Sequence, residues 1–129
     1  MNGLFNVLSE DSFLTINGHI LRSFEVDTAL ILALFIDYQS EVDNQQKENE
    51  ERVYFSLTQV TIEEKLYMSS HKQLKAIKLL EKLGILHTQI KGLPSKKYYY
   101  IDEDAVFHYL GQTVEQNRLA VINLKKGEE

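Results

Sequence analysis

The segment Ser69–Ile101 constrains the fold and chemistry of this chain more than any other part of it. It contains seven lysines and a single acid, Glu81, so its formal charge is +6 in a chain whose total is −5. The other 96 residues therefore carry −11. A helix-like stretch in this segment is followed at once by two strand-like stretches around a Gly-Leu-Pro-Ser turn. A basic helix beside a basic hairpin, inside an acidic protein, predicts a surface that meets an anionic partner, and nucleic acid is the first candidate.

Length and composition limit the other possibilities. The 129 residues suffice for one domain with a single core, and the absence of cysteine excludes a disulfide framework and a thiolate metal site. No apolar run approaches the ~20 residues that a membrane span requires, and the first residues lack the pattern of a signal peptide. We therefore expect a cytoplasmic protein that contacts no membrane. The net charge of −5 argues against a general nucleic-acid coat and favours a binder with a small basic face.

Local signals predict an alternation of short strands and helices. From the N-terminus, the expected elements are a strand over 13–16, a turn at Asn17-Gly18, a strand over 19–21, a buried helix over 27–39, an acidic loop over 41–51 and a strand over 53–57. There follow a helix from the Thr58 cap to Leu66, a helix from the Ser69 cap to Leu83, strands over 85–91 and 96–101, and a helix over 103–110 closed by Gly111.

This order predicts an α+β fold, specifically a winged helix-turn-helix with a three-helix core, a β-hairpin wing and additional terminal elements. Residues 1–111 are expected to form the winged-helix domain. Residues 112–129 are expected to form a C-terminal tail, with Val114, Leu119, Val121, Ile122 and Leu124 as candidates for a homodimer contact. Dimers are common in this class because two copies read two half-sites.

The helix over 69–83 is expected to have two unlike sides. At 100° per residue, an apolar side is made by Ala76, Ile77, Leu79, Leu80 and Leu83. A basic stripe made by His71, Lys75, Lys78 and Lys82 lies opposite. A solvated lysine face is the ordinary interpretation of such a helix taken alone. The absence of interleaved acids, and the same charge sign on the adjacent hairpin, favour DNA.

We therefore predict contacts with double-stranded DNA along this helix, the hairpin tip and the start of the preceding helix. Residues near the N-terminus of the basic helix would approach base edges, and those further along would meet phosphates. The full predicted set is Thr58, Gln59, Ser69, Ser70, His71, Lys72, Gln73, Lys75, Lys78, Lys82, Lys91, Ser95, Lys96 and Lys97. Leu74 lies beside the stripe, and the sequence leaves open whether it touches a thymine methyl, packs on the preceding helix or meets a protein.

The run from Phe55 to Ile101 resembles the winged helix-turn-helix domain of phage and plasmid replication proteins from Gram-positive bacteria. That family includes the N-terminal domain of primosomal DnaD-type proteins and phage replisome organisers. The residues that carry the resemblance are Ser69-Ser-His-Lys-Gln73, Lys75-Ala-Ile-Lys78, Leu80-Glu-Lys-Leu-Gly-Ile85 and Lys91-Gly-Leu-Pro-Ser-Lys-Lys-Tyr-Tyr99. The resemblance implies DNA binding in a mobile element. Family members usually continue into a second domain, and the short segment after the last expected helix instead favours a small regulator or replication accessory factor.

Nothing in the sequence indicates an enzyme. The four histidines, His19, His71, His87 and His108, lack metal-ligand spacing, and no nucleotide-binding loop or nucleophile motif is present. We expect no metal and no cofactor. The alternative to a DNA binder is a winged helix that binds a protein partner, such as a replication or regulatory protein. The target sequence, and the choice between replication, transcription and transfer, cannot be read from the residues.

Overall fold

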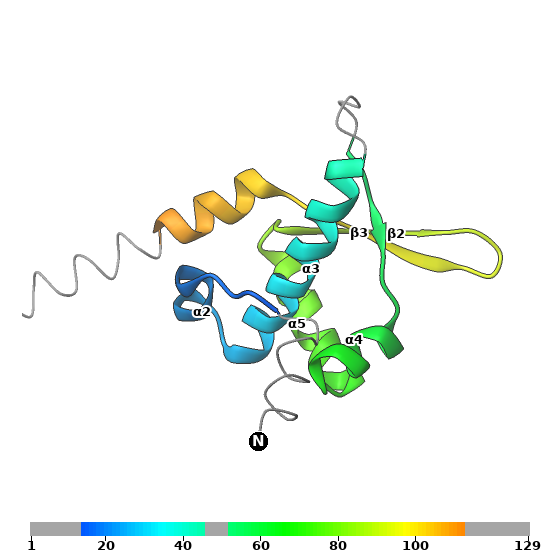
Figure 1. Cartoon of the computed structure of the whole chain (residues 1–129), viewed down its shortest axis with the longest axis horizontal. Coiled ribbons are helices and arrows are strands. Elements are labelled where there is room, and N and C mark those ends of the chain that lie inside the picture. The colour runs from blue at the N-terminus through cyan, green and yellow to red at the C-terminus, as the bar shows by residue number, and fades with distance from the viewer. Residues whose placement is uncertain (1–13, 46–51, 113–129) are drawn as a thin grey trace, which may run out of the picture.

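The computed structural model describes residues 14–45 and 52–112 and has the expected α+β class (Figure 1). In chain order the elements are α2 (Gly18–Ser23), α3 (Val26–Gln45), β1 (Phe55–Ser56), α4 (Gln59–Leu66), α5 (Ser70–Lys82), β2 (Leu86–Lys91), β3 (Lys96–Ile101) and a last described helix over residues 103–112. Within the described ranges, no helix has the length and apolar character needed to cross a membrane.

The three strands form one antiparallel sheet in the order β1-β3-β2. The hairpin pairs Leu86 with Ile101 at its base and Lys91 with Lys96 at its tip. On the other edge of β3, Phe55 of β1 pairs with Tyr99. The hairpin lies on the right of Figure 1 and extends away from the helices. Its base therefore belongs to the core, while its tip is exposed.

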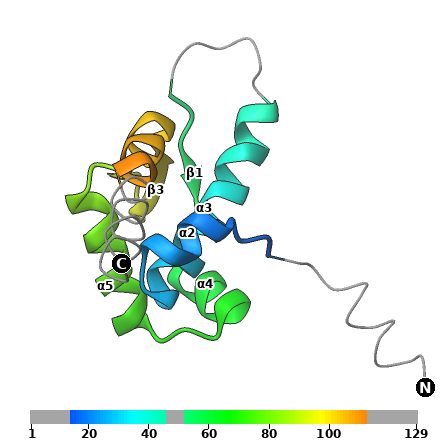
Figure 2. The same ribbon diagram turned by 90° about the vertical axis from the view of Figure 1, so that its left-hand side faces the viewer.

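Helix α3 runs through the middle of the molecule, with α5 on one side and the sheet on another (Figures 1 and 2). It is almost continuously apolar over residues 29–36, and Ala29, Ile31, Leu32 and Phe35 are fully buried. The Phe35 ring lies 4.9 Å from the Tyr99 ring and 5.5 Å from the Phe55 ring. A helix that is apolar nearly all round is stable only when neighbours cover it, and α5 and the sheet supply that cover.

Short-range signals set the ends of α4 and α5 as predicted. The Thr58 hydroxyl accepts a hydrogen bond from the Thr61 N–H at 3.1 Å and caps α4. The Ser69 hydroxyl accepts from the Lys72 N–H at 3.4 Å and caps α5. Tyr67 adopts a left-handed conformation (φ 50°) at the end of α4, and Gly84 does the same (φ 76°) after α5. Only Tyr67 and Met68 separate the end of α4 from the Ser69 cap of α5, so the two helices are joined by a short turn.

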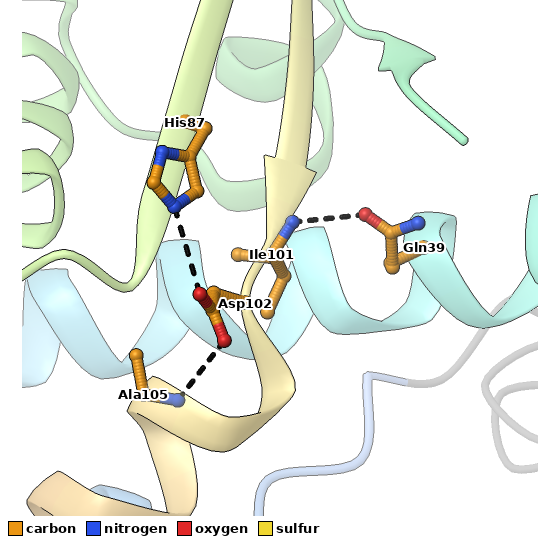
Figure 3. Close-up of polar contacts among 5 residues, drawn as sticks. All are labelled: Gln39, His87, Ile101, Asp102 and Ala105. Atoms are coloured by element: carbon orange, nitrogen blue, oxygen red, sulfur yellow. Dashed lines mark hydrogen bonds and ion pairs between the residues drawn. The ribbon is translucent and has the colours of Figure 1, made fainter. Parts of the chain in front are cut away.

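Gln39 connects α3 with the end of β3 and with the segment before β1, a role that the sequence did not indicate (Figure 3 shows the bond to Ile101). Its Oε1 accepts from the Ile101 N–H at 2.9 Å, and its Nε2 donates to the Val53 carbonyl at 2.8 Å and the Asp43 carboxylate at 3.0 Å. Next to it, Asp102 accepts from the Ala105 N–H at 3.1 Å and caps the last described helix, as predicted. Gln39 is only 6% exposed, so water does not compete for its amide. Its bond to the Ile101 N–H therefore holds the base of the hairpin against α3.

The N-terminal part of the prediction was wrong. In place of the expected turn at Asn17-Gly18 and strand over 19–21, Gly18–Ser23 form helix α2, because the Asn17 side chain accepts from the His19 N–H at 2.8 Å and caps it. Asn-Gly starts a tight turn or caps a helix by the same local hydrogen bond. Residues 14–16 are not in a strand, and residue 13 lies outside the described ranges.

Two helices are longer than predicted. Helix α3 extends through Gln45 into the expected acidic loop, since glutamate and glutamine propagate a helix already held by its buried half. The last described helix passes through Gly111, which therefore does not close it. Leu79, expected on the apolar side of α5, is 39% exposed.

Candidate nucleic-acid interface

Thirteen of the fourteen side chains predicted to contact DNA are exposed. The exposed set comprises Thr58, Gln59, Ser69, Ser70, His71, Lys72, Lys75, Lys78, Lys82, Lys91, Ser95, Lys96 and Lys97. For the members on α5, exposure follows from the opposite side of this helix, where Ala76, Ile77 and Leu80 are buried against the core. The amphipathic pattern of this helix thus leaves its polar side free to meet a ligand.

Gln73 is the exception, because its side chain is buried, which argues against the predicted DNA contact. Its side chain is 1% exposed, and its Nε2 donates to the Met68 carbonyl at 2.9 Å and to the Gln59 carbonyl at 3.2 Å. Both acceptors belong to α4 or to the turn after it, so the amide ties α5 to α4. A buried amide with its two N–H groups committed to backbone acceptors serves the architecture of the unit.

Among the described residues, no carboxylate forms an ion pair with the lysines of this surface. Across the ranges 14–45 and 52–112, the one contact between a basic and an acidic side chain is His87 Nε2 to Asp102 Oδ2 at 3.7 Å, at the base of the hairpin, and it is an ion pair only when the imidazole is protonated (Figure 3). None of the seven lysines of α5, β2 and β3 pairs with a described carboxylate. At the hairpin tip, Lys91 and Lys96 are direct cross-strand partners. Like charges placed opposite each other destabilise a hairpin, so an anionic ligand that shields them would stabilise it.

A groove of about 260 Å³ joins α4, α5 and the hairpin into one surface. Its polar lining comes from Ser56, Thr58, Gln59, Gln73, Ser95, Lys96 and Lys97, and its apolar lining from Leu57, Ile62, Leu74, Ile77 and Tyr99. Residues far apart in the chain, such as Thr58 and Lys97, thus lie around a common hollow. The sequence predicted the separate basic elements but could not indicate this junction, which depends on how the hairpin meets the helices.

Tyr99 closes the inner side of this groove as an uncharged group. Burial raises the pKa of the Tyr99 phenol above its ordinary value of 10.0, and the nearby Glu81 carboxylate raises this pKa further. The ring is therefore neutral at physiological pH and does not offset the charge of Lys96 and Lys97. Of the three consecutive tyrosines at 98–100, Tyr99 is the buried one, and its ring lies 5.9 Å from the Phe55 ring.

A second groove, of about 330 Å³, lies elsewhere on the molecule between α2, α3 and the last described helix. Ile20, Ile36, Val106, Phe107 and Leu110 supply most of its apolar lining, and Asp43 and Glu103 supply carboxylates. Phe107 is 64% exposed. Because no lysine or arginine lines it, this groove is unsuited to an anionic ligand.

The fold and the basic surface together define a small α+β domain in which two consecutive helices, α4 and α5, and a hairpin surround one groove with cations at its edge. The fold is similar to a solved structure described as the N-terminal domain of a DNA binding protein. The TM-score is 0.55 and the identity 18%, with 88% of this chain and 91% of that chain covered. No family model matches the sequence, and none of the curated proteins compared with it matches. At this identity the likeness concerns the fold.

Proposed function

We propose that this protein binds double-stranded DNA in a sequence-directed way through a winged helix-turn-helix. In this proposal α5 is the recognition helix in the major groove, and the β2–β3 hairpin is the wing on the flanking backbone. The observation that carries the proposal is the set of seven lysines on α5 and the hairpin, exposed and unpaired among the described residues. Clustered cations without internal partners suit a ligand with closely spaced phosphates.

Each part of the surface has a distinct task in this proposal. Ser70, His71 and Lys75, near the N-terminus of α5, approach base edges, while Lys78 and Lys82 bind phosphates along one strand. Thr58 and Gln59 lie at the N-terminus of α4, where free backbone N–H groups favour an anion, and they bind a further phosphate of the DNA backbone. The wing lysines bind the backbone beyond the groove. The similarity of fold to the N-terminal domain of a DNA binding protein supports this arrangement.

The biological setting that we propose rests on the sequence resemblance. A small regulator or replication accessory factor of a phage or plasmid would need DNA recognition without catalysis, and we propose no enzymatic role. A homodimer would read two half-sites. The apolar tail residues proposed for its contact, Val114 to Leu124, lie outside the described residues. Removal of residues 113–129 should then lower the mass measured in solution by light scattering to that of a single truncated chain.

The test is selection of bound duplexes from a random pool, followed by anisotropy titrations on the selected sequence and on its single strands. The parent should retain the duplex in preference to either strand. Lys75→Glu combined with Lys78→Glu should abolish binding while leaving the melting temperature nearly unchanged, because both side chains are exposed. Equal binding by this double variant would show that α5 does not face the DNA.

A protein-binding role is the second candidate, and the groove of about 330 Å³ is the observation that favours it. An apolar floor with Asp43 and Glu103 among its lining residues suits a segment of a partner protein that combines apolar and basic side chains. The discriminating result is recovery of such a partner together with no retention of any duplex at low salt. If the partner is lost on Phe107→Ser while duplex binding persists, the protein has two separate faces.

A further inference from the structure

Leu74 is an exposed apolar residue within the polar surface proposed to meet DNA. It is 43% exposed, although it lies on α5 near buried residues such as Ile77. Its neighbours on the helix surface, three or four residues away, include Ser70, His71 and Lys78, which are all exposed. A single exposed leucine is unremarkable on a protein surface. Its position is what calls for an explanation, because polar and cationic groups surround it.

Only part of the Leu74 side chain lies in the groove between α5 and the hairpin, and the rest is exposed. Leu74 lines the groove together with Gln59 and Ile62 of α4. Ser95, Lys96 and Lys97 stand across the groove. The exposed part of Leu74 therefore forms an apolar spot between the start of α4 and the cations of the hairpin.

Leu79 provides an internal comparison on the same helix. It is 39% exposed, nearly the same fraction as Leu74, but it does not line the groove and lies five residues further along. The two leucines thus share chemistry and exposure and differ in position. An effect specific to Leu74 would report the ligand and not a general loss of apolar surface on α5.

We infer that Leu74 is a specificity determinant that contacts the 5-methyl group of a thymine in the major groove. This inference rests on the proposed function. The edges of the unmodified base pairs in the major groove carry hydrogen-bond donors and acceptors, and the thymine methyl is their one apolar group. A leucine surrounded by phosphate-binding cations meets a duplex at base edges, where that methyl is the complementary surface. Uracil, which lacks only this methyl, forms the same base pairs.

The experiment uses the full chain and the duplex recovered by selection, with each thymine replaced in turn by deoxyuridine. For the parent protein, one or two replacements should weaken binding about three- to fivefold, the change expected for burial of one methyl group. Leu74→Ala should bind the thymine duplex as weakly as the parent binds the deoxyuridine duplex at that position, and it should no longer distinguish the two. Leu74→Met, which keeps an apolar side chain of similar size, should still distinguish them.

Leu79→Ala is the matched control and should retain the full thymine preference. The melting temperature of each variant is compared with that of the parent to show that the variant is folded. If Leu74→Ala keeps the parent's preference at every thymine, or if no thymine replacement affects the parent, the inference is wrong. In either case salt-dependent duplex binding would leave the proposed function intact. If the parent binds no duplex at all, the proposed function itself fails. Duplex binding by the parent thus distinguishes failure of the Leu74 inference from failure of the proposed function.

Discussion

Replacement of Gln73 by methionine tests whether this residue joins two helices or contacts DNA. Methionine is similar in length and flexibility to glutamine, so the substitution keeps the packing and removes the amide. In the parent, Nε2 donates to the Met68 carbonyl at 2.9 Å and the Gln59 carbonyl at 3.2 Å. Both acceptors lose this donor in the variant.

The expected loss of stability follows from the burial of these acceptors. The hydrogen bond to Met68 is buried, so its carbonyl would be left without this partner in a site that water enters poorly, at a cost of about 1–3 kcal/mol. The bond to Gln59 is only partly buried, and water can replace the donor there. The gain from burying the methionine thioether offsets part of the loss. We therefore expect a decrease of roughly 1–3 kcal/mol in the free energy of unfolding.

Urea denaturation followed by circular dichroism measures this change, with an unchanged slope showing that the two-state comparison holds. Gln59→Met is the control, because the Gln59 side chain is exposed and its backbone carbonyl is retained, and it should change stability by less than about 0.5 kcal/mol. At a temperature where all variants are folded, Gln73→Met should bind the selected duplex as the parent does. A stable Gln73→Met variant with weakened DNA binding would refute the structural role and restore the base contact predicted from sequence.

Three further predictions concern charge, the core and pH. About five phosphate contacts give a slope of log affinity against log salt near −4 to −5, and Lys78→Gln with Lys82→Gln, which removes two proposed phosphate contacts, should reduce its magnitude by about 1.8; an unchanged slope would contradict the proposed contacts. Gln39→Leu leaves the buried Ile101 N–H unpaired at the base of the hairpin and should cost roughly 1–3 kcal/mol in urea denaturation, so a loss near zero would refute its bridging role. The raised pKa of Tyr99 means that the unfolded chain releases this proton first, so stability should fall as pH rises above 10.0. Tyr99→Phe should remove that part of the pH dependence, and an identical pH profile would argue against it.

The elements that carry the proposed site were predictable because their signals are local. Thr58 and Ser69 cap α4 and α5 through hydrogen bonds that span three residues, and Gly84 ends α5 through its own backbone angle. The strands of the hairpin follow from the residues on either side of a short turn. Such interactions form between near neighbours whatever the rest of the chain does, so the sequence specifies them directly. The exposure of the basic stripe on α5 was predictable for a similar reason. Lysine is rarely buried, and the apolar side of the helix opposite the stripe faces the core.

Burial of polar groups and the junction of distant segments depended instead on how the elements pack. The sequence contains nothing that distinguishes Gln73, which is buried, from Gln59, which is exposed. Whether a glutamine amide is buried depends on which backbone carbonyls of a neighbouring helix lie within hydrogen-bonding distance of it. Gln39 meets the Ile101 N–H across 62 positions of chain, and no local pattern encodes a contact of that range. The groove between Leu74 and Lys96 likewise exists because α3 holds α5 and the sheet together. Local hydrogen bonding and hydrophobic periodicity thus set the elements, while packing around α3 set which side chains remain available to a ligand.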